Sequence, residues 1–582
     1  MPGPTDSEAA ALAGLRSLAD LLHYRATVQP DDRAYLVLSD RGNAERAITF
    51  GALAGAAEAL ARRIAARSEP GDRALLLCPT GIDFMIGFFG CMLAGVVAVP
   101  IMLPRRTGAR DASVAIAADC TPRLAIAPAS VVGARGTELA ERFGSSRIEW
   151  LSVEETEEAP EIPPKPAAQH DLAFLQYTSG STAAPKGVMV SHANLLANLD
   201  MIRRACGNTR ESTYVSWVPL YHDMGLITSA LQTLYVGALC VFLAPVAFVQ
   251  RPLVWLRAIS DYRAAVAGGP NFAFDLCVER SRPDQLNGID LSCWKIAFNS
   301  AEPIRAETLR RFARHFARSG FSAAALYPAY GMAEATVMAT AGRPGGGAAI
   351  REFSRDGLAR RRAVPPRDAA DAQVLVGSGK AIAPGRVAIV DPETGRPLEP
   401  GRIGEVWVAG PHVARGYWRN GAATATTFGA RLADPPRDGE GSGWLRSGDL
   451  GFLDSSGELF IAGRIKDVVI IRGINHYPQD IEDTVQRCHP ALRPHGGAAF
   501  AIEGGDEAEG LVILQEVERT ERHRIAPDEI AARIRAAVVG AHDIMPFEIV
   551  LLRPGSLPLT TSGKIQRGLS RQLWQTGALD RL

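Results

Sequence analysis

The chain has 582 residues, 47% of them hydrophobic and 22% charged, so it is long enough for several domains and a large core. Its 63 basic and 63 acidic side chains balance, which excludes a general electrostatic attraction to nucleic acid or to an anionic membrane. The eight cysteines are scattered without a CxxC pair, which favours reduced thiols in the cytoplasm over disulfides or a zinc site. The N-terminal stretch lacks the basic region of a signal peptide.

The first feature along the chain that needs interpretation is the uncharged run at 84–104, which is long enough to span a bilayer. Gly87, Gly90 and Gly95 interrupt it, and prolines follow its valine-rich end. This pattern is typical of a buried helix that leads into a buried strand. We therefore expect core structure here and no stable membrane insertion.

Strand-like apolar runs alternate with helical patterns over most of the chain, as at 73–78 and 96–101. That alternation predicts an α/β fold with βα units and largely parallel sheets. Residues 343–372 are rich in glycine, proline and arginine, and we expect them to form an insertion on a loop. After residue 464 the pattern changes to short strands and two helices, which predicts a small α+β domain.

One short stretch, "YTSGSTAAPKG" at 177–187, has the composition of a phosphate-binding loop. Its glycines let the backbone approach a ligand closely, and amides and hydroxyls can donate to phosphate oxygens. Its lysine is notable because the chain has only six lysines among 63 basic residues, and Lys186, Lys466 and Lys564 all lie near glycine in polar stretches. The order Pro-Lys-Gly differs from a Walker A loop. The alternative is an ordinary Gly/Ser connection.

This stretch resembles the phosphate-binding signature of the adenylate-forming enzymes, which include acyl-CoA synthetases, peptide-synthetase adenylation domains and luciferases. Other stretches follow in the order of that family, namely "NSAEPI" (299–304), "YGMAEAT" (330–336), "GEVWVAGPHVARGYW" (404–418), "WLRSGDLG" (444–451), "GRIKDVVIIRG" (463–473) and "LPLTTSGKIQR" (557–567). The resemblance implies a large N-terminal lobe of several subdomains, residues 1–464, and a small mobile C-terminal domain, residues 465–582. ATP and Mg²⁺ would bind between them.

The resemblance also implies roles for individual side chains. The ATP phosphates would be held by one loop and its lysine, namely Thr178, Ser179, Gly180, Ser181, Thr182 and Lys186. Glu334 falls where the family binds magnesium, a hard cation that carboxylate and phosphate oxygens can share. Asp449, helped by Arg464, would accept from the ribose hydroxyls. The remaining nucleotide positions are Ala301, Glu302, Tyr330, Gly331 and Met332.

The resemblance implies three catalytic residues, Lys564, Lys186 and His222, of which the two lysines would neutralise charge. Lys564 resembles the lysine that neutralises charge while the carboxylate attacks the α-phosphorus, and Lys466 matches the hinge of the C-terminal domain. His222, in "YHDMG", matches a position near the acyl carboxylate, although a satisfied core or surface histidine is the alternative. Ala333 departs from the threonine that many members carry, which removes one hydroxyl contact.

Within the family, the stretches "SWVPLYHDMGLI" (216–227), "GGPNFAFDLC" (268–277) and "IIRGINHYPQDIE" (470–482) resemble the fatty-acyl-AMP ligases more than the acyl-CoA ligases. The insertion at 343–372 lies where that branch carries one, thought to hinder the use of CoA. Met224, Phe272 and Phe274 either line an acyl tunnel or belong to the core.

The resemblance therefore implies ATP-dependent conversion of a fatty acid to an acyl-adenylate with release of pyrophosphate. The acyl group would then pass to the phosphopantetheine of an acyl carrier protein, or of a carrier domain of a polyketide or peptide synthase. Because few residues follow 567, we expect this acceptor to be a separate protein. The alternatives are a fatty acyl-CoA ligase and a non-catalytic protein that binds lipid or adenylate. The presence of Lys564, Glu334 and Asp449 together argues against the non-catalytic alternative.

Overall fold

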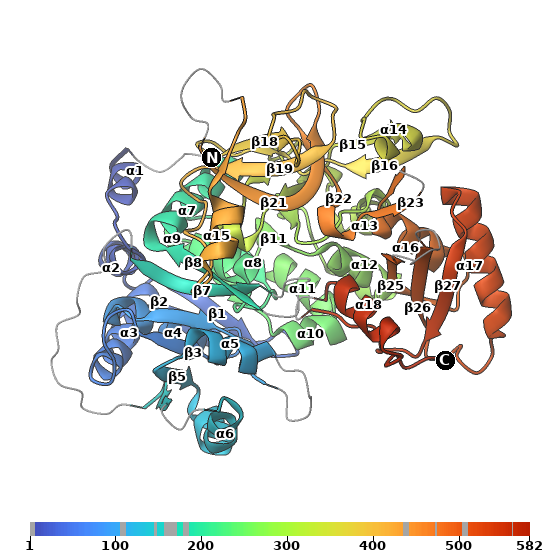
Figure 1. The fold of residues 1–582 in the computed structure, drawn as a ribbon. Helices are drawn as coiled ribbons and strands as arrows, with labels where there is room; N and C mark the ends of the chain where they lie inside the picture. The colour runs from blue at the N-terminus through green and yellow to red at the C-terminus, as the bar shows by residue number, and fades with distance from the viewer. Residues whose placement is uncertain are drawn as a thin grey trace.

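The fold contains a large N-terminal lobe and a smaller C-terminal α+β domain (Figure 1). The computed structural model describes residues 6–104, 112–144, 148–155, 171–178, 185–434, 442–471, 474–502, 510–560 and 563–582. None of the helices within these ranges combines the length and the apolar composition that a membrane span requires.

The largest sheet of the N-terminal lobe has a parallel centre with antiparallel strands at both edges. Its strand order is β17 (Lys380–Ala381), β14 (Thr340–Ala341), β13 (Leu326–Tyr330), β12 (Ile296–Asn299), β11 (Val266–Gly269), β9 (Tyr214–Ser216), β10 (Cys240–Phe242), β1 (Arg33–Leu38) and β2 (Ala44–Thr49). The six strands from β13 to β1 all run parallel. The βα alternation of the sequence predicted this arrangement, and the prediction is confirmed.

A second sheet is parallel except at one edge, where β8 pairs antiparallel with β7. Its order is β6 (Glu149–Ser152), β5 (Leu124–Ala127), β3 (Arg73–Leu76), β4 (Val97–Pro100), β7 (Leu172–Thr178) and β8 (Lys186–Ser191). The apolar run at 84–104 forms most of helix α4 (Ile82–Ala94), which ends at Gly95 in a left-handed conformation and leads into β4. Every residue from Phe84 to Ala94 is buried, so the run is core structure, as predicted.

Several stretches that the sequence singled out directly follow the carboxyl ends of parallel strands, in both sheets. Thr178 ends β7, and the segment with His222 follows β9. Glu302 follows β12, and Gly331 follows β13. In open parallel sheets, ligands bind at the carboxyl ends of the strands. The topology thus places the predicted site segments at the sheet edges where sites are usual.

A third, mainly antiparallel sheet lies between the large sheets and the C-terminal domain in sequence, and is drawn in yellow and orange in Figure 1. It contains β18 (Arg386–Val390), β19 (Gly404–Ala409), β21 (Ser442–Leu453) and β20 (Ala430–Arg431), with β22 (Leu459–Arg464) paired to β21. After β22 comes a short helical turn, η6 (Ile465–Asp467), which contains Lys466.

The C-terminal domain, red in Figure 1, is built on β25 (Leu492–Ile502), β26 (Gly510–Val517) and β27 (Pro546–Leu552). Helices α16 (Pro478–Arg487) and α17 (Pro527–His542) help to form its core, with Ile481 and Ile534 fully buried. The sequence pattern predicted two helices in this domain, and this count was wrong because α18 (Arg567–Gln575) is a third. This helix is only nine residues long, and Ser570 is its only buried residue, so it contributes few side chains to the core.

The stretch at 343–372 is more ordered than the expected loop. Strand β15 (Ile350–Ser354) pairs with β16 (Ala372–Val376), and α14 (Arg355–Ala359) follows β15. The ring of Phe353 packs against those of Phe452 and Phe460 at 5.0 and 5.2 Å, and this burial stabilises the hairpin. The hairpin also touches the C-terminal domain, because Arg355 Nη1 donates to the carbonyl oxygen of Ala541 at 3.0 Å.

An aromatic cluster fills the core beneath α12 (Asn271–Glu279) and α13 (Ala306–Phe316). Phe274 is fully buried there, and its ring lies 4.9 Å from that of Phe312 and 6.2 Å from that of Trp255. Of the two roles left open for Phe274, the core is therefore the one observed. Phe272 is half-buried, with its ring 5.9 Å from that of Trp217.

Replacement of Phe274 by alanine should lower the free energy of unfolding by about 3–5 kcal/mol, because it leaves a cavity in this cluster. The matched control is Val246→Ala, a residue of the same lobe that is 63% exposed and should change stability by less than about 0.5 kcal/mol. Urea unfolding followed by tryptophan fluorescence measures both. A Phe274→Ala variant with unchanged stability and an altered acyl preference would contradict the assignment to the core.

Candidate active site

Lys186 and Glu334 are connected through one aromatic side chain, Tyr417. The Nζ atom of Lys186 lies 4.8 Å from the centre of the Tyr417 ring, a cation–π distance. The Tyr417 hydroxyl donates to Oε1 of Glu334 at 2.8 Å. Tyr417 and Glu334 are only 6% and 8% exposed, so this hydrogen bond is made away from bulk water. The arrangement fixes the lysine and the carboxylate relative to each other.

Local backbone pairing explains how Tyr417 reaches this position. Residues 416–418 run alongside β8, where the Met189 amide donates to Gly416 and the Trp418 amide donates to Gly187. Lys186 begins β8 and pairs with Thr178 at the end of β7. The segment with Tyr417 therefore continues the second sheet next to the predicted phosphate loop. Four residues of that loop, Ser179, Gly180, Ser181 and Thr182, lie outside the described residues.

Asp449 lies at the centre of a second polar group. It is paired with Arg464 across β21 and β22, and Arg464 Nε donates to Asp449 Oδ1 at 2.9 Å. Tyr330, at the end of β13, donates its hydroxyl to Asp449 Oδ2 at 2.8 Å. The negative charge of Asp449 raises the pKa of Arg464 above its ordinary value, and burial raises the pKa of Tyr330. Both carboxylate oxygens of Asp449 thus have a donor.

Lys564 comes from the C-terminal domain and lies among charges of the N-terminal lobe. The surrounding protein and then the positive charge of Arg464 lower its pKa, while three carboxylates, those of Asp223, Glu302 and Asp449, oppose that shift. Its loop closes on itself, because the Thr560 amide donates to the Lys564 carbonyl at 2.7 Å and the Lys564 amide donates to the Thr560 hydroxyl at 3.0 Å.

Arg567 holds the Lys564 loop to the rest of the C-terminal domain. Its guanidinium donates to both oxygens of Glu482 at 2.7 Å and to Asp467 Oδ2 at 3.0 Å. Such bidentate arginine–carboxylate pairs fix geometry as well as charge. Glu482 belongs to α16 and Asp467 follows Lys466, so one arginine joins the lysine loop, α16 and the predicted hinge.

The predicted nucleotide residues after β12 and β13 have restricted backbones. Ala301 has a φ of +74°, which is strained for a residue with a Cβ atom. At Gly331, a Cβ atom would lie 1.8 Å from the carbonyl oxygen of Val337, so only glycine fits. Glu302 accepts from the Phe272 amide at 2.6 Å, and burial raises its pKa. Met332 is half-buried beside Tyr330 in a separate small apolar cluster.

His222 precedes a short helix, α8 (Asp223–Gly225), and Met224 of this helix lines an apolar pocket. Its ring lies 4.7 Å from that of Tyr221, whose carbonyl oxygen accepts from Gln176 Nε2 of β7 at 3.0 Å. Burial raises the pKa of the next residue, Asp223, above its ordinary value. The charge of Lys564 opposes this shift, and the charge of Glu334 adds to it. A π-helix, Leu226–Leu231, follows; such segments are frequent at functional sites.

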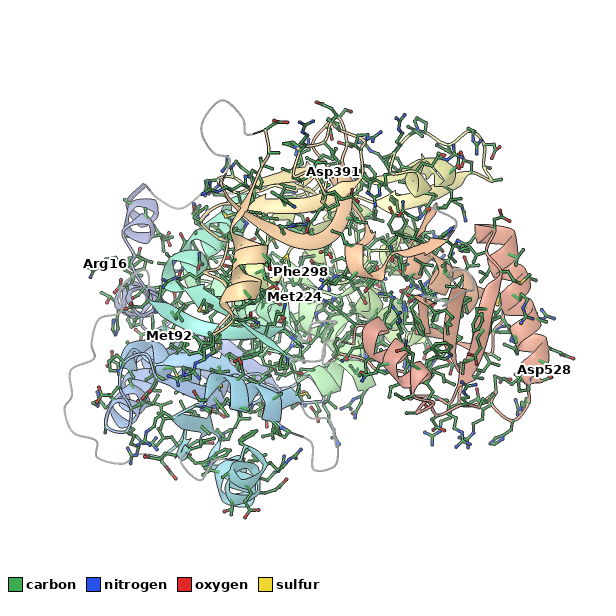
Figure 2. All side chains as sticks on the ribbon, in the orientation of Figure 1. Arg16, Met92, Met224, Phe298, Asp391 and Asp528 are labelled. Carbon is green, nitrogen blue, oxygen red and sulfur yellow. The ribbon has the colours of Figure 1, made fainter. Side chains whose placement is uncertain are left out.

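Met224 lines this small pocket and is also a buried member of the main core, so its two predicted roles both stay open. In Figure 2 it lies beside Phe298 near the centre of the molecule. The pocket reaches Tyr330, and its lining is otherwise apolar apart from two hydroxyl side chains; the members are Met224, Thr228, Phe298, Ser300, Ala329, Tyr330, Val337 and Met338.

Among the described residues, hydrogen bonds and ring contacts join the predicted residues in two groups: Lys186 with Glu334 through Tyr417, and Tyr330 with Arg464 through Asp449. Sequence reasoning missed Tyr417, Asp223 and Arg567, although each lies inside a quoted stretch. The only hint in the sequence was that each is an aromatic or charged residue within a recognised stretch. Lys466 lies in η6, beyond Arg464, and contacts none of the site residues through a hydrogen bond recorded among the described residues.

Comparison with known proteins identifies the chain. A family model described as AMP-binding enzyme matches residues 22–418, and one described as Disco-interacting protein 2-like, AMP domain, matches residues 466–581. The medium-chain-fatty-acid–[acyl-carrier-protein] ligase JamA of Moorena producens (strain JHB) is 41% identical over 575 residues, 97% of this chain and 96% of that protein. The long-chain-fatty-acid–AMP ligase FadD26 of Mycobacterium bovis is 35% identical over 582 residues, 97% and 98% of the two chains.

A solved structure of fatty acyl-adenylate ligase from L. pneumophila, in complex with acyl adenylate and pyrophosphate, matches with a TM-score of 0.75 and 36% identity over 97% of each chain. The chain therefore belongs to the AMP-binding, adenylate-forming enzymes, which use ATP. Within them it is a member of the fatty-acyl-AMP ligases.

Tyr417→Phe keeps the ring next to Lys186 but removes the hydroxyl from Glu334, whereas Tyr417→Leu removes both. We expect the phenylalanine variant to bind ATP about tenfold more weakly in the presence of Mg²⁺, because a buried carboxylate loses its donor. Without divalent cation, only the leucine variant should lose affinity. Calorimetric titration with ATP measures both conditions, and thermal unfolding checks that the variants are folded. Identical ATP binding by all three proteins would contradict the assigned contact.

Proposed function

We propose that this protein activates a fatty acid with ATP and then transfers the acyl group to the phosphopantetheine thiol of a carrier protein. In the first step a carboxylate oxygen bonds to the α-phosphorus, and the bond from that phosphorus to the β-phosphate oxygen breaks, so pyrophosphate leaves. In the second step the thiol sulfur bonds to the acyl carbon, the bond from that carbon to the AMP oxygen breaks, and the thiol proton passes to solvent.

The observation that carries this proposal is the position of Lys564 among Asp223, Glu302 and Asp449. A carboxylate that attacks a polyphosphate meets a large negative charge, and a positioned ammonium group reduces that cost. The carboxylates would hold Lys564 in its charged form. His222, which precedes Asp223, would orient this segment toward the acyl carboxylate.

The nucleotide would bind across the polar groups described above. Lys186, Thr178 and the stretch Ser179–Thr182 would hold the phosphates, since small hydroxyl residues, glycine and a lysine suit phosphate oxygens. Asp449, with Arg464, would accept from the ribose hydroxyls. The segments with Ala301, Glu302, Tyr330, Gly331 and Met332 would border the nucleotide, because Tyr330 already contacts Asp449.

The residues present fit Mg²⁺ bound mainly by the nucleotide. Among the described residues there is no group of three or more histidine, cysteine or carboxylate side chains that could hold a metal ion alone. Mg²⁺ in ATP-using enzymes is usually held by one or two carboxylates and by substrate phosphates. Glu334, oriented by Tyr417, would provide that carboxylate. The ion would supply positive charge against the phosphates.

The two lobes would comprise residues 1–464 and 465–582, and Lys466 would be the hinge between them. The separate hydrophobic core of the C-terminal domain supports this division. The ordered stretch at 343–372, which contacts that domain through Arg355, supports a restriction on its movement and on the use of CoA. The names of JamA and FadD26 support a carrier protein and a fatty acid as partners. The eight free thiols suit the cytoplasm.

The direct test is to incubate the purified protein with ATP, Mg²⁺ and a mixture of fatty acids, with and without CoA, and to identify the products by mass spectrometry. We expect acyl-adenylate and pyrophosphate in both conditions and little acyl-CoA. Rapid conversion to acyl-CoA would favour the alternative of a fatty acyl-CoA ligase. Absence of any acyl-adenylate would favour a non-catalytic binding protein.

The matched variants for this test are Lys564→Ala and Lys380→Ala. Loss of the Lys564 ammonium should slow acyl-adenylate formation by about 100-fold or more, while ATP binding persists, because the lysine acts on the charge that develops during the reaction. Lys380 is exposed on the short edge strand β17, and its replacement should leave the rate unchanged. Equal rates in both variants would end the assignment of Lys564.

A further inference from the structure

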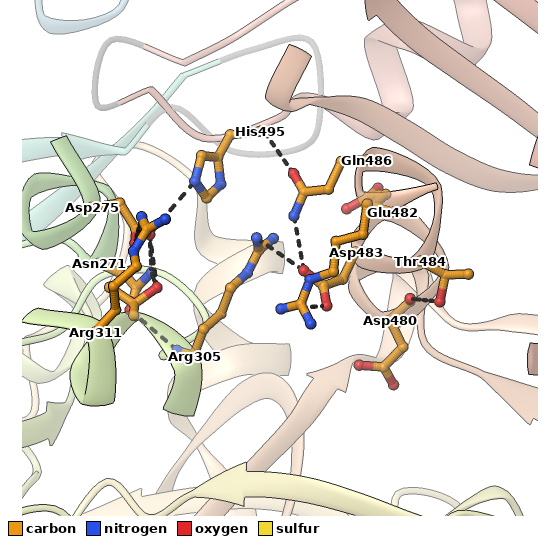
Figure 3. A network of polar contacts seen from close by, with 12 residues as sticks. Asn271, Asp275, Arg305, Arg311, Asp480, Glu482, Asp483, Thr484, Gln486 and His495 are labelled. Atoms are coloured by element: carbon orange, nitrogen blue, oxygen red, sulfur yellow. Dashed lines mark hydrogen bonds and ion pairs between the residues drawn. The ribbon is translucent and has the colours of Figure 1, made fainter. Parts of the chain in front are cut away.

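A network of polar side chains joins the two lobes (Figure 3). Arg305, just before α13 in the N-terminal lobe, pairs with Asp483 of α16 in the C-terminal domain, with Nη1 3.2 Å from Oδ1. Both side chains are about a quarter exposed, at 25% and 27%, so water screens the pair only in part. Asp483 also pairs with Arg487 on the next turn of α16, at 3.0 Å.

A second contact lies beside the first. His495 has a φ of +57° in an irregular part of β25, where the register with β26 shifts between Leu492 and Gly497. Bulges of this kind redirect a side chain, and here the imidazole Nε2 lies 3.8 Å from Oδ2 of Asp275. The His495 amide donates to Gln486 Oε1 at 2.7 Å, which ties the irregular segment to α16.

The N-terminal side of these contacts is held firmly. Asp275 is 7% exposed and accepts from the Thr308 hydroxyl at 2.7 Å and from Arg311 Nη2 at 2.5 Å. The amide of Arg305 donates to Asn271 Oδ1 at 3.1 Å. Asp275 and Arg305 are thus fixed to α12 and α13, and they offer the C-terminal domain one negative and one positive group.

A short series of contacts leads from this interface to the catalytic lysine. Asp483, which faces Arg305, is adjacent in α16 to Glu482, which binds Arg567 through both oxygens at 2.7 Å. Arg567 is three residues beyond Lys564. On the other side, Arg305 is three residues beyond Glu302, one of the carboxylates that act on Lys564. The interface therefore joins both sides of the lysine site through rigid, hydrogen-bonded elements.

We propose that Arg305–Asp483 and Asp275–His495 form a latch that positions Lys564 for acyl-adenylate formation, and that the transfer of the acyl group does not need it. The proposal rests on the two-step function proposed above. The four residues are positioning residues, because they act through α16, Glu482 and Arg567. Opening the latch would leave each lobe intact and would let the lysine loop move away from the nucleotide.

Charge reversal tests the latch. Arg305→Glu and Asp483→Arg each place like charges opposite each other, and the double variant restores an opposite pair. Acyl-adenylate formation in a single turnover should slow about tenfold or more in each single variant, because displacement of a catalytic group is costly to rate. In the double variant it should recover to within about threefold of the native rate if the effects of the two changes couple. Arg553→Glu is the matched control, since its partner Asp580 lies in the same domain, 3.5 Å away.

Two further readouts separate a latch from a general structural effect. Transfer from a preformed dodecanoyl-adenylate to an acyl carrier protein that bears phosphopantetheine should proceed at the native rate in all variants. Hydrogen exchange over 271–279 and 478–495 should accelerate in the single variants and return to native in the double variant. Equal slowing of both steps, or native rates and native exchange in the single variants, would overturn the proposal. If the native protein forms no acyl-adenylate, the proposed function fails, while the exchange data still decide whether the contact holds the lobes together.

Discussion

The ammonium group of Lys564 and the carboxylates of Asp223, Glu302 and Asp449 belong to different parts of the fold, and their approach requires the two lobes to be in this arrangement. A lysine on a separate domain can be brought to a polyanionic substrate and withdrawn again, whereas a lysine within the sheet could not. The cost is that the position of the lysine depends on the contacts that hold its loop and its domain in place. Arg567 and α16 provide those contacts on the side of the C-terminal domain.

The N-terminal lobe meets the same requirement through topology. Parallel strands of one sheet end at the same edge, so β9, β12 and β13 of the largest sheet bring segments that are far apart in the chain to one edge, and β7 ends in the same way in the second sheet. The conformations at these ends are restrictive, as the φ of Ala301 and the crowded Gly331 show. Tyr417 then connects Lys186 to Glu334, so the groups proposed for phosphate and metal share one rigid support. In each case packed neighbours hold a charged or polar group in place, and little acid–base chemistry is needed.

The sequence was informative where local composition determines structure. The βα alternation predicted the parallel sheets, and glycines within 84–104 correctly favoured a core helix over a membrane span. The sequence was uninformative where partners are distant, as for Tyr417 and Glu334, or for Arg305 and Asp483. The order at 343–372 was missed because it depends on Phe353 packing against residues about 100 positions away. Burial at that distance leaves no periodic signal in the local sequence.

The pH dependence of acyl-adenylate formation tests the central role of Lys564 most directly. The surrounding protein and Arg464 lower the pKa of this lysine from its ordinary value of 10.5, so its charge is lost at a lower pH than in a free lysine. The rate should therefore fall as pH rises through that lowered pKa, and the fall should move to higher pH in Lys564→Arg, because arginine stays charged. A native profile that is flat on the alkaline side, or one that Lys564→Arg leaves unchanged, would contradict the account.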